Sequence, residues 1–74
     1  MLLKGQIWQT VRPLWSWTCD GKIYIDKSYV IPSQELFVII QVCNKTLKSV
    51  ILTSKSGILH VVSYDLQQQA RNIS

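Results

Sequence analysis

The residues of this sequence best suited to chemistry are aromatic, and they gather in its first third. Three tryptophans lie within ten residues of one another, together with an arginine, and two tyrosines follow: Trp8, Arg12, Trp15, Trp17, Tyr24 and Tyr29. Tryptophan, tyrosine and arginine are enriched at binding interfaces. Exposed aromatic rings can also stack on nucleobases. We therefore take these six residues as candidate partner-binding residues.

The size of the chain limits how many of these rings it can bury. Its 74 residues form one domain, residues 1–74, with a modest interior. The apolar runs at residues 36–42 and 50–52 already fill much of that interior. We expect one or two tryptophans in the core and at least one on the surface.

Lysines offer a second binding chemistry. The net charge is +4, which suits an anionic partner and also favours solubility. Five lysines are expected on or beside loops: Lys22, Lys27, Lys45, Lys48 and Lys55. If they converged on the aromatic residues, they could follow a nucleic-acid backbone. Scattered solubilising charge is the alternative.

Residues that could support catalysis or metal binding do not form a pattern. His60 is the single histidine, and Cys19 and Cys43 show no CxxC spacing. The four acidic residues are not paired, and the three glycines form no phosphate-binding loop. We expect no catalytic site, no metal and no cofactor. Two reduced cysteines are expected, although one disulfide between them is geometrically feasible.

The pattern of β-branched and aromatic residues predicts an all-β domain. The predicted strands are residues 4–11, 14–18, 22–26, 29–31, 35–43, 48–53 and 58–64. Asp20 and Gly21 favour a turn that pairs residues 14–18 with 22–26, and Gly57 favours a tight turn before the last of these strands. The segment 35–43 is apolar on both faces, which predicts a central strand covered on each side. We expect Leu36, Val38, Ile40 and Val42 on one face of it.

The C-terminal residues predict a short helical turn. Asp65 is a candidate cap for the backbone N–H of Gln68, whose side chain would reach back as in a capping box. Leu66 and Ala70 are the apolar residues expected to hold this turn against the sheet.

This layout resembles that of an SH3-like small barrel, with an OB-like barrel as the closest alternative. Residues 14–33 take the place of the long first loop, 44–47 of the second loop and 54–57 of the distal turn. Residues 63–69 match the helical turn, and 71–73 match the last strand. The resemblance implies five to six antiparallel strands with a short C-terminal helical turn. The acidic loop residues and the proline that recognise proline-rich peptides have no counterpart, and residues 4–8 only partly resemble the nucleic-acid-binding KOW type.

Two functions follow as expectations. The first is a non-catalytic module that binds and modulates another protein, since barrels of this size resemble small accessory and inhibitor proteins of phages. The second is nucleic-acid binding by the same aromatics and the lysines. Self-association through an exposed strand is a third expectation. The first residues show no signal peptide and the longest apolar run is too short to span a bilayer, which predicts a cytoplasmic protein, in the host if phage-encoded.

Overall fold

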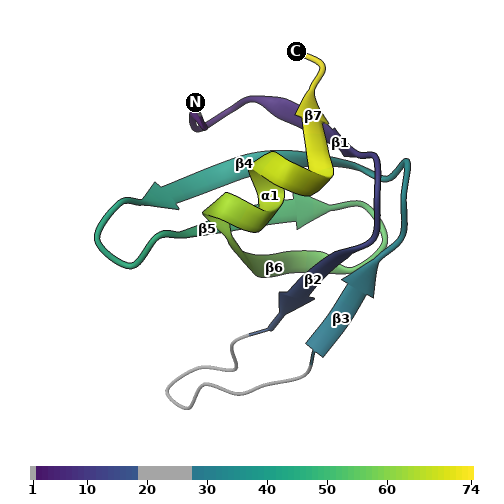
Figure 1. The fold of residues 1–74 in the computed structure, drawn as a ribbon, viewed down its shortest axis with the longest axis horizontal. Coiled ribbons are helices and arrows are strands. Elements are labelled where there is room, and N and C mark those ends of the chain that lie inside the picture. The colour runs from purple at the N-terminus through teal and green to yellow at the C-terminus, as the bar shows by residue number, and fades with distance from the viewer. Residues whose placement is uncertain (1, 19–27) are drawn as a thin grey trace.

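The computed structural model describes residues 2–18 and 28–74 (Figure 1). The predicted turn at Asp20 and Gly21, together with Lys22, Tyr24 and Lys27, lies outside the described residues. The described elements are β1 (Ile7–Thr10), β2 (Leu14–Trp17), β3 (Ser28–Ile31), β4 (Leu36–Cys43), β5 (Lys48–Thr53), β6 (Gly57–Val62), α1 (Ser63–Gln69) and β7 (Ala70–Asn72).

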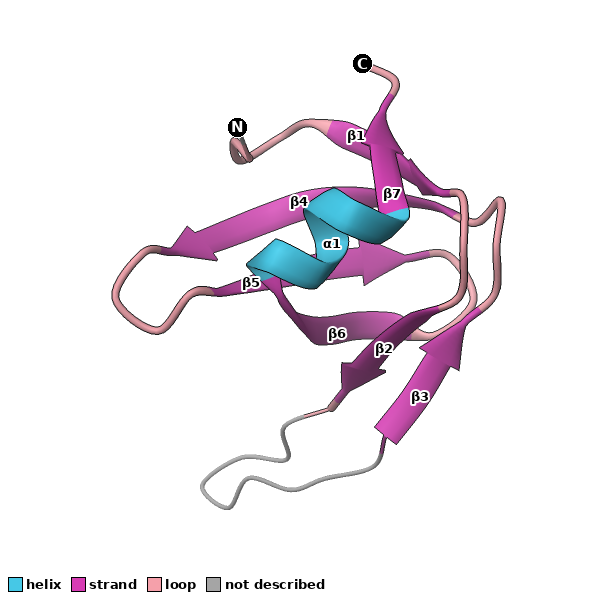
Figure 2. Ribbon diagram, in the orientation of Figure 1, coloured by secondary structure: helices cyan, strands magenta, loops and turns pink. Residues whose placement is uncertain are grey.

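These strands form one curled antiparallel sheet in the order β3-β2-β6-β5-β4-β1-β7. The sheet makes a half-barrel, and α1 packs against β2, β6 and β7 (Figure 2). The all-β prediction is confirmed, as are the C-terminal helix and the meander of β4, β5 and β6. The described sheet has seven strands, where five to six were expected, because the predicted first loop itself contributes β2 and β3.

β2 lies between β3 and β6 in the sheet. β2 pairs with β3, with Trp15 opposite Val30, and it contacts β6 on its other side, where Trp17 is opposite His60. The sequence prediction paired residues 14–18 with residues 22–26, which lie outside the described residues.

One face of the sheet carries the core, and we call it the inner face. Its centre is a row across three strands, in which Ile51 lies opposite both Ile39 and Leu59. All three side chains are fully buried. Leu66 of α1 is also fully buried and belongs to the same cluster. The inner face is therefore closed by the helix, and burial of these side chains is the main stabilising contribution.

A β-bulge in β4 changes the predicted alternation. The register with β5 shifts between Ile39 and Gln41, which leaves Ile40 as the extra residue. Val42 consequently packs against the core on the same side as Ile39, not with Leu36. Leu36 is 51% exposed. β4 is central in the order of strands, as expected, but the prediction that both of its faces are covered was wrong.

The helix begins without the predicted cap. Val62 is the N-cap residue and makes no side-chain capping bond, while Asp65 lies inside the first turn. The helix ends where the N–H of Ala70 donates to the carbonyl of Leu66. The two predicted anchors are confirmed, since Leu66 and Ala70 are both buried. Tertiary packing, not capping, holds so short a helix in place.

Among the described residues, no helix has the length and apolar character that a membrane span requires.

Candidate binding surface

The side of the sheet opposite the core is open and apolar, and we call it the outer face. Because residues opposite each other in a sheet share a face, the register defines its members. One row crosses four strands: Ile7 is opposite Val38, Val38 opposite Leu52, and Leu52 opposite Ile58. Ile7, Leu52 and Ile58 are all more than 40% exposed. The outer face therefore carries a continuous apolar row in contact with solvent.

Aromatic residues extend this row toward the β2–β3 hairpin. His60 lies two residues from Ile58 on β6, so it shares the outer face, and it is opposite Trp17. The Trp17 and His60 rings stack with their centroids 6.2 Å apart. Lys48 Nζ lies 5.5 Å from the centroid of the Trp17 ring, within the range of a cation–π contact. These contacts leave Trp17 half-buried and fix its orientation on the sheet.

Trp15 is the most exposed indole of the described chain. It lies two residues before Trp17 on the same face of β2, and its side chain is 65% exposed. Val30, directly opposite on β3, is 45% exposed. A large ring this open to water in the isolated chain is typical of an anchor residue that becomes buried on binding.

Three other predicted partner-binding residues lie in the described chain, and none of them belongs to the apolar row: Trp8, Arg12 and Tyr29. Trp8 is only 6% exposed and its indole N–H donates to Gln6 Oε1 at 3.1 Å, so its assignment to the contact surface was wrong. Tyr29 is opposite the buried Ser16, which places it on the inner side of the hairpin. Arg12 is exposed in the connection between β1 and β2. The expectation that one or two tryptophans are buried and at least one is exposed is confirmed.

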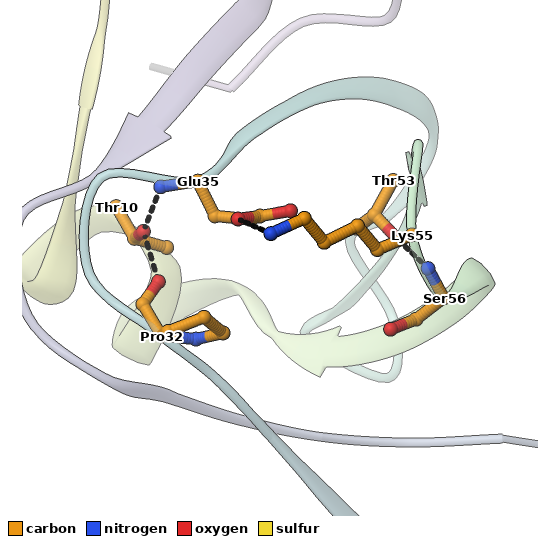
Figure 3. Close-up of polar contacts among 6 residues, drawn as sticks. All are labelled: Thr10, Pro32, Glu35, Thr53, Lys55 and Ser56. Atoms are coloured by element: carbon orange, nitrogen blue, oxygen red, sulfur yellow. Dashed lines mark hydrogen bonds and ion pairs between the residues drawn. The ribbon is translucent and has the colours of Figure 1, made fainter.

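The lysines of the described segments do not converge. Lys48 begins β5 and contacts Trp17, whereas Lys55 follows the far end of the same strand. Lys55 Nζ lies 3.7 Å from Glu35 Oε1 (Figure 3). Lys45 lies in the turn between β4 and β5. In the part of the chain that the structure describes, Lys48 is thus the lysine that lies against an aromatic ring.

Sequence reasoning missed the apolar row of the outer face. Alternation identified each strand, but it could not say that Leu52 and Ile58 remain uncovered, since the sequence does not show where the single helix packs. The sequence signal for this row is the number of apolar residues. They occupy both sets of alternating positions in several strands, and there are more of them than one small interior can hold.

Cys43 is a free thiol at the end of β4. Hydrogen bonds from the Thr46 side chain, and from the backbone N–H groups of Thr46 and Lys45, lower the pKa of the Cys43 thiol. Hydrogen bonds to a thiolate favour the charged form, which is the nucleophile.

We predict that Thr46→Val raises the pKa of Cys43 and slows its alkylation by iodoacetamide near neutral pH. The rate should be followed against pH in a Cys19→Ser background, so that a single thiol reacts. The midpoint of the wild-type profile should lie at lower pH than that of the Thr46→Val variant, and coincident profiles would show that Thr46 does not stabilise the thiolate.

Within residues 2–18 and 28–74, no three histidine, cysteine, aspartate or glutamate side chains gather as a metal-binding cluster. The chemistry that the outer face offers is apolar and aromatic contact beside one lysine and one histidine. Comparison of the chain with protein-family models, with curated proteins and with solved structures gave no match.

Proposed function

We propose that this protein is a non-catalytic binding module that binds another protein through its outer face. The observation that carries the proposal is the 65% exposure of Trp15, which lies on the same outer face as the exposed apolar residues Ile7, Leu52 and Ile58. Small proteins rarely expose contiguous apolar surface without using it for association. Tryptophan at such a position contributes more binding energy than other residue types. The same proposal includes a finer assignment. The protein is an SH3-like accessory protein, such as those of phages, and it modulates the protein that it binds.

The surroundings of the outer face favour a partner with an acidic rim. Lys48 and His60 lie on this face, and the two carboxylates of the described chain lie elsewhere. Glu35 is paired with Lys55, and its side chain is only 13% exposed. Asp65 lies in the first turn of α1, the helix that closes the inner face. Complementary charge speeds association and excludes wrong partners more than it adds affinity.

Nucleic acid is the less well supported partner. A groove that follows a phosphate backbone needs several cations beside the stacking rings. Here a single described lysine, Lys48, contacts a ring, while Lys55 is engaged with Glu35 at the other end of β5. The apolar row of Ile7, Leu52 and Ile58 has no charged or hydrogen-bonding side chain that could bind a phosphate. These features fit a protein surface better than a nucleic acid.

The test compares wild-type protein with Trp15→Ala in affinity capture from the native host, followed by measurement of binding to each captured protein. We expect Trp15→Ala to weaken the interaction about 30-fold, the effect of losing a hot-spot residue of about 2 kcal/mol. Tyr29→Ala is the matched control, because it removes an exposed ring from the other side of the same hairpin. Since Trp15 is largely exposed, its loss should change the free energy of unfolding by no more than about 0.5 kcal/mol.

Two outcomes would contradict the proposal. One is a captured protein that Trp15→Ala binds as tightly as wild type does. The other is tight binding of fluorescein-labelled single- or double-stranded oligonucleotides, with an affinity that falls steeply as salt rises and that is lost in Trp15→Ala.

A further inference from the structure

A second apolar surface lies away from the outer face, where the turn between β4 and β5 meets the start of α1. There a half-open hollow of about 450 Å³ is lined by Leu2, Val42, Leu47, Tyr64 and Gln67, among others. A second hollow of about 490 Å³ shares Leu2, Val42 and Asn44 with the first and continues as far as Lys4. We call the two together the end groove. Each hollow has the size of a pocket that takes one or two side chains.

The walls of the end groove are held to each other. The backbone N–H of Ser63 donates to the carbonyl of Leu47 at 2.9 Å, which ties the start of α1 to the turn. The hydroxyls of Ser49 and Ser63 are 2.7 Å apart and hydrogen-bonded. Because these bonds join the turn to the start of α1, and both segments line the first hollow, the groove is present before anything binds and little ordering cost remains.

The backbone of Leu47 adopts a conformation that is unfavourable for leucine. Its φ is +59°, in the left-handed region that favours glycine, and its side chain is 65% exposed. Tyr64 on the other wall is 67% exposed. A strained residue whose large side chain buries little in the isolated chain points to a use in binding.

Positive charge predominates beside the end groove. Lys4 lines the second hollow and Lys45 follows the lining residue Asn44, whereas Asp65, which follows Tyr64, is the one acidic residue of the described chain next to a lining residue. No carboxylate of the described residues lines either hollow. Ser63, Gln67 and Asn44 supply hydrogen-bonding groups. An occupant must therefore present apolar side chains to the floor and negative charge to the rim.

From this geometry we infer that the end groove binds an acidic peptide segment that carries one or two large apolar side chains. The apolar floor between Leu47 and Tyr64 excludes a ligand held by phosphates alone. Two hollows in series suit side chains on successive positions of one peptide. The site is separate from the outer face, so the protein would contact two partners, or two parts of one partner.

The test uses fluorescence anisotropy with fluorescein-labelled hexapeptides and full-length protein. The probe is Asp-Glu-Leu-Phe-Asp-Glu, and two controls reverse its charges or replace its apolar pair by serine. We expect micromolar binding of the probe and at least tenfold weaker binding of either control. Equal binding of the charge-reversed peptide, or no binding of the probe at micromolar concentrations, would overturn the inference.

Leu47→Gly separates binding from folding. Glycine accepts the positive φ and removes the side chain, so the unfolding midpoint should stay the same or rise while probe affinity falls about tenfold. Tyr64→Ala should weaken the probe to a similar extent.

Trp15→Ala should leave probe binding unchanged, which keeps this inference distinct from the proposed function of the outer face. Loss of binding in Trp15→Ala with full binding in Leu47→Gly would place the peptide on the outer face and reject the end groove. Displacement of the probe by oleate, with no dependence on the peptide's acidic residues, would equally reject a peptide site.

Discussion

Leu59→Ala is expected to destabilise the protein by about 3 kcal/mol or more, the largest single effect that we predict. Leu59 is fully buried in β6 and lies opposite Ile51 at the centre of the inner face. Removing its side chain leaves a cavity between the sheet and α1, which adds to the lost transfer free energy. A small domain has a total stability of only about 5–10 kcal/mol. The variant should therefore be marginally folded at room temperature.

Urea unfolding followed by circular dichroism measures this loss, and Leu36→Ala is its matched control. Leu36→Ala is the same leucine-to-alanine change, but Leu36 lies on the outer face and is 51% exposed. The expected loss of stability is therefore about 1 kcal/mol. Equal losses for the two variants would contradict the assignment of inner and outer faces. Such a result would mean that the outer face is as well covered in solution as the core, for instance by a second copy of the chain, which light scattering would detect.

The part of the fold predicted correctly from the sequence depends on local signals. The strands of the meander have strong alternation or continuous apolar runs. Gly57, the first residue of β6, has a positive φ of 72° where the tight turn ends. Leu66 and Ala70 were identified as anchors because they are the apolar residues of an otherwise polar segment. These features do not depend on how distant segments of the chain pair or pack.

The errors arose where distant residues decide the local structure. The bulge at Ile40 reverses the phase of β4, and no residue type in the segment signals it, because its neighbours are apolar in both phases. Asp65 has the chemistry of a cap, but β6 continues to Val62 and passes directly into the helix, which moves the cap position three residues earlier. Trp8 is buried because β1 lies between β4 and β7, a pairing of residues far apart in sequence.

The candidate site shows the same division. Trp15 and Trp17 were identified from residue type alone, and they share the outer face as their spacing predicts. The apolar row beside them required the register of four strands, since Ile7 and Ile58 are separated by most of the chain. A surface assembled across a sheet is specified by pairing, which composition and spacing do not contain.

Thr10→Val is expected to destabilise the protein by about 2 kcal/mol although it barely changes the volume of the side chain. Thr10 is fully buried at the end of β1. Its hydroxyl donates to the carbonyl of Pro32 at 2.6 Å and accepts from the N–H of Glu35 at 2.8 Å (Figure 3). Valine fills the same space but leaves these two backbone groups without their partner, and an unsatisfied buried polar group costs about 1–3 kcal/mol.

The position of Thr10 explains why this hydroxyl matters to the whole sheet. The turn between β3 and β4 contains Gln34 at a φ of +65°, a strained conformation that the surrounding bonds must hold. The backbone of Thr10 accepts from Gln34 and donates to Glu35, so the strand and the side chain together organise the turn. Thr10→Ser keeps the hydroxyl and should cost no more than about 1 kcal/mol in the same urea experiment. If valine proved harmless and serine costly, the methyl group and not the hydroxyl would be what stabilises the junction between β1 and the β3–β4 turn.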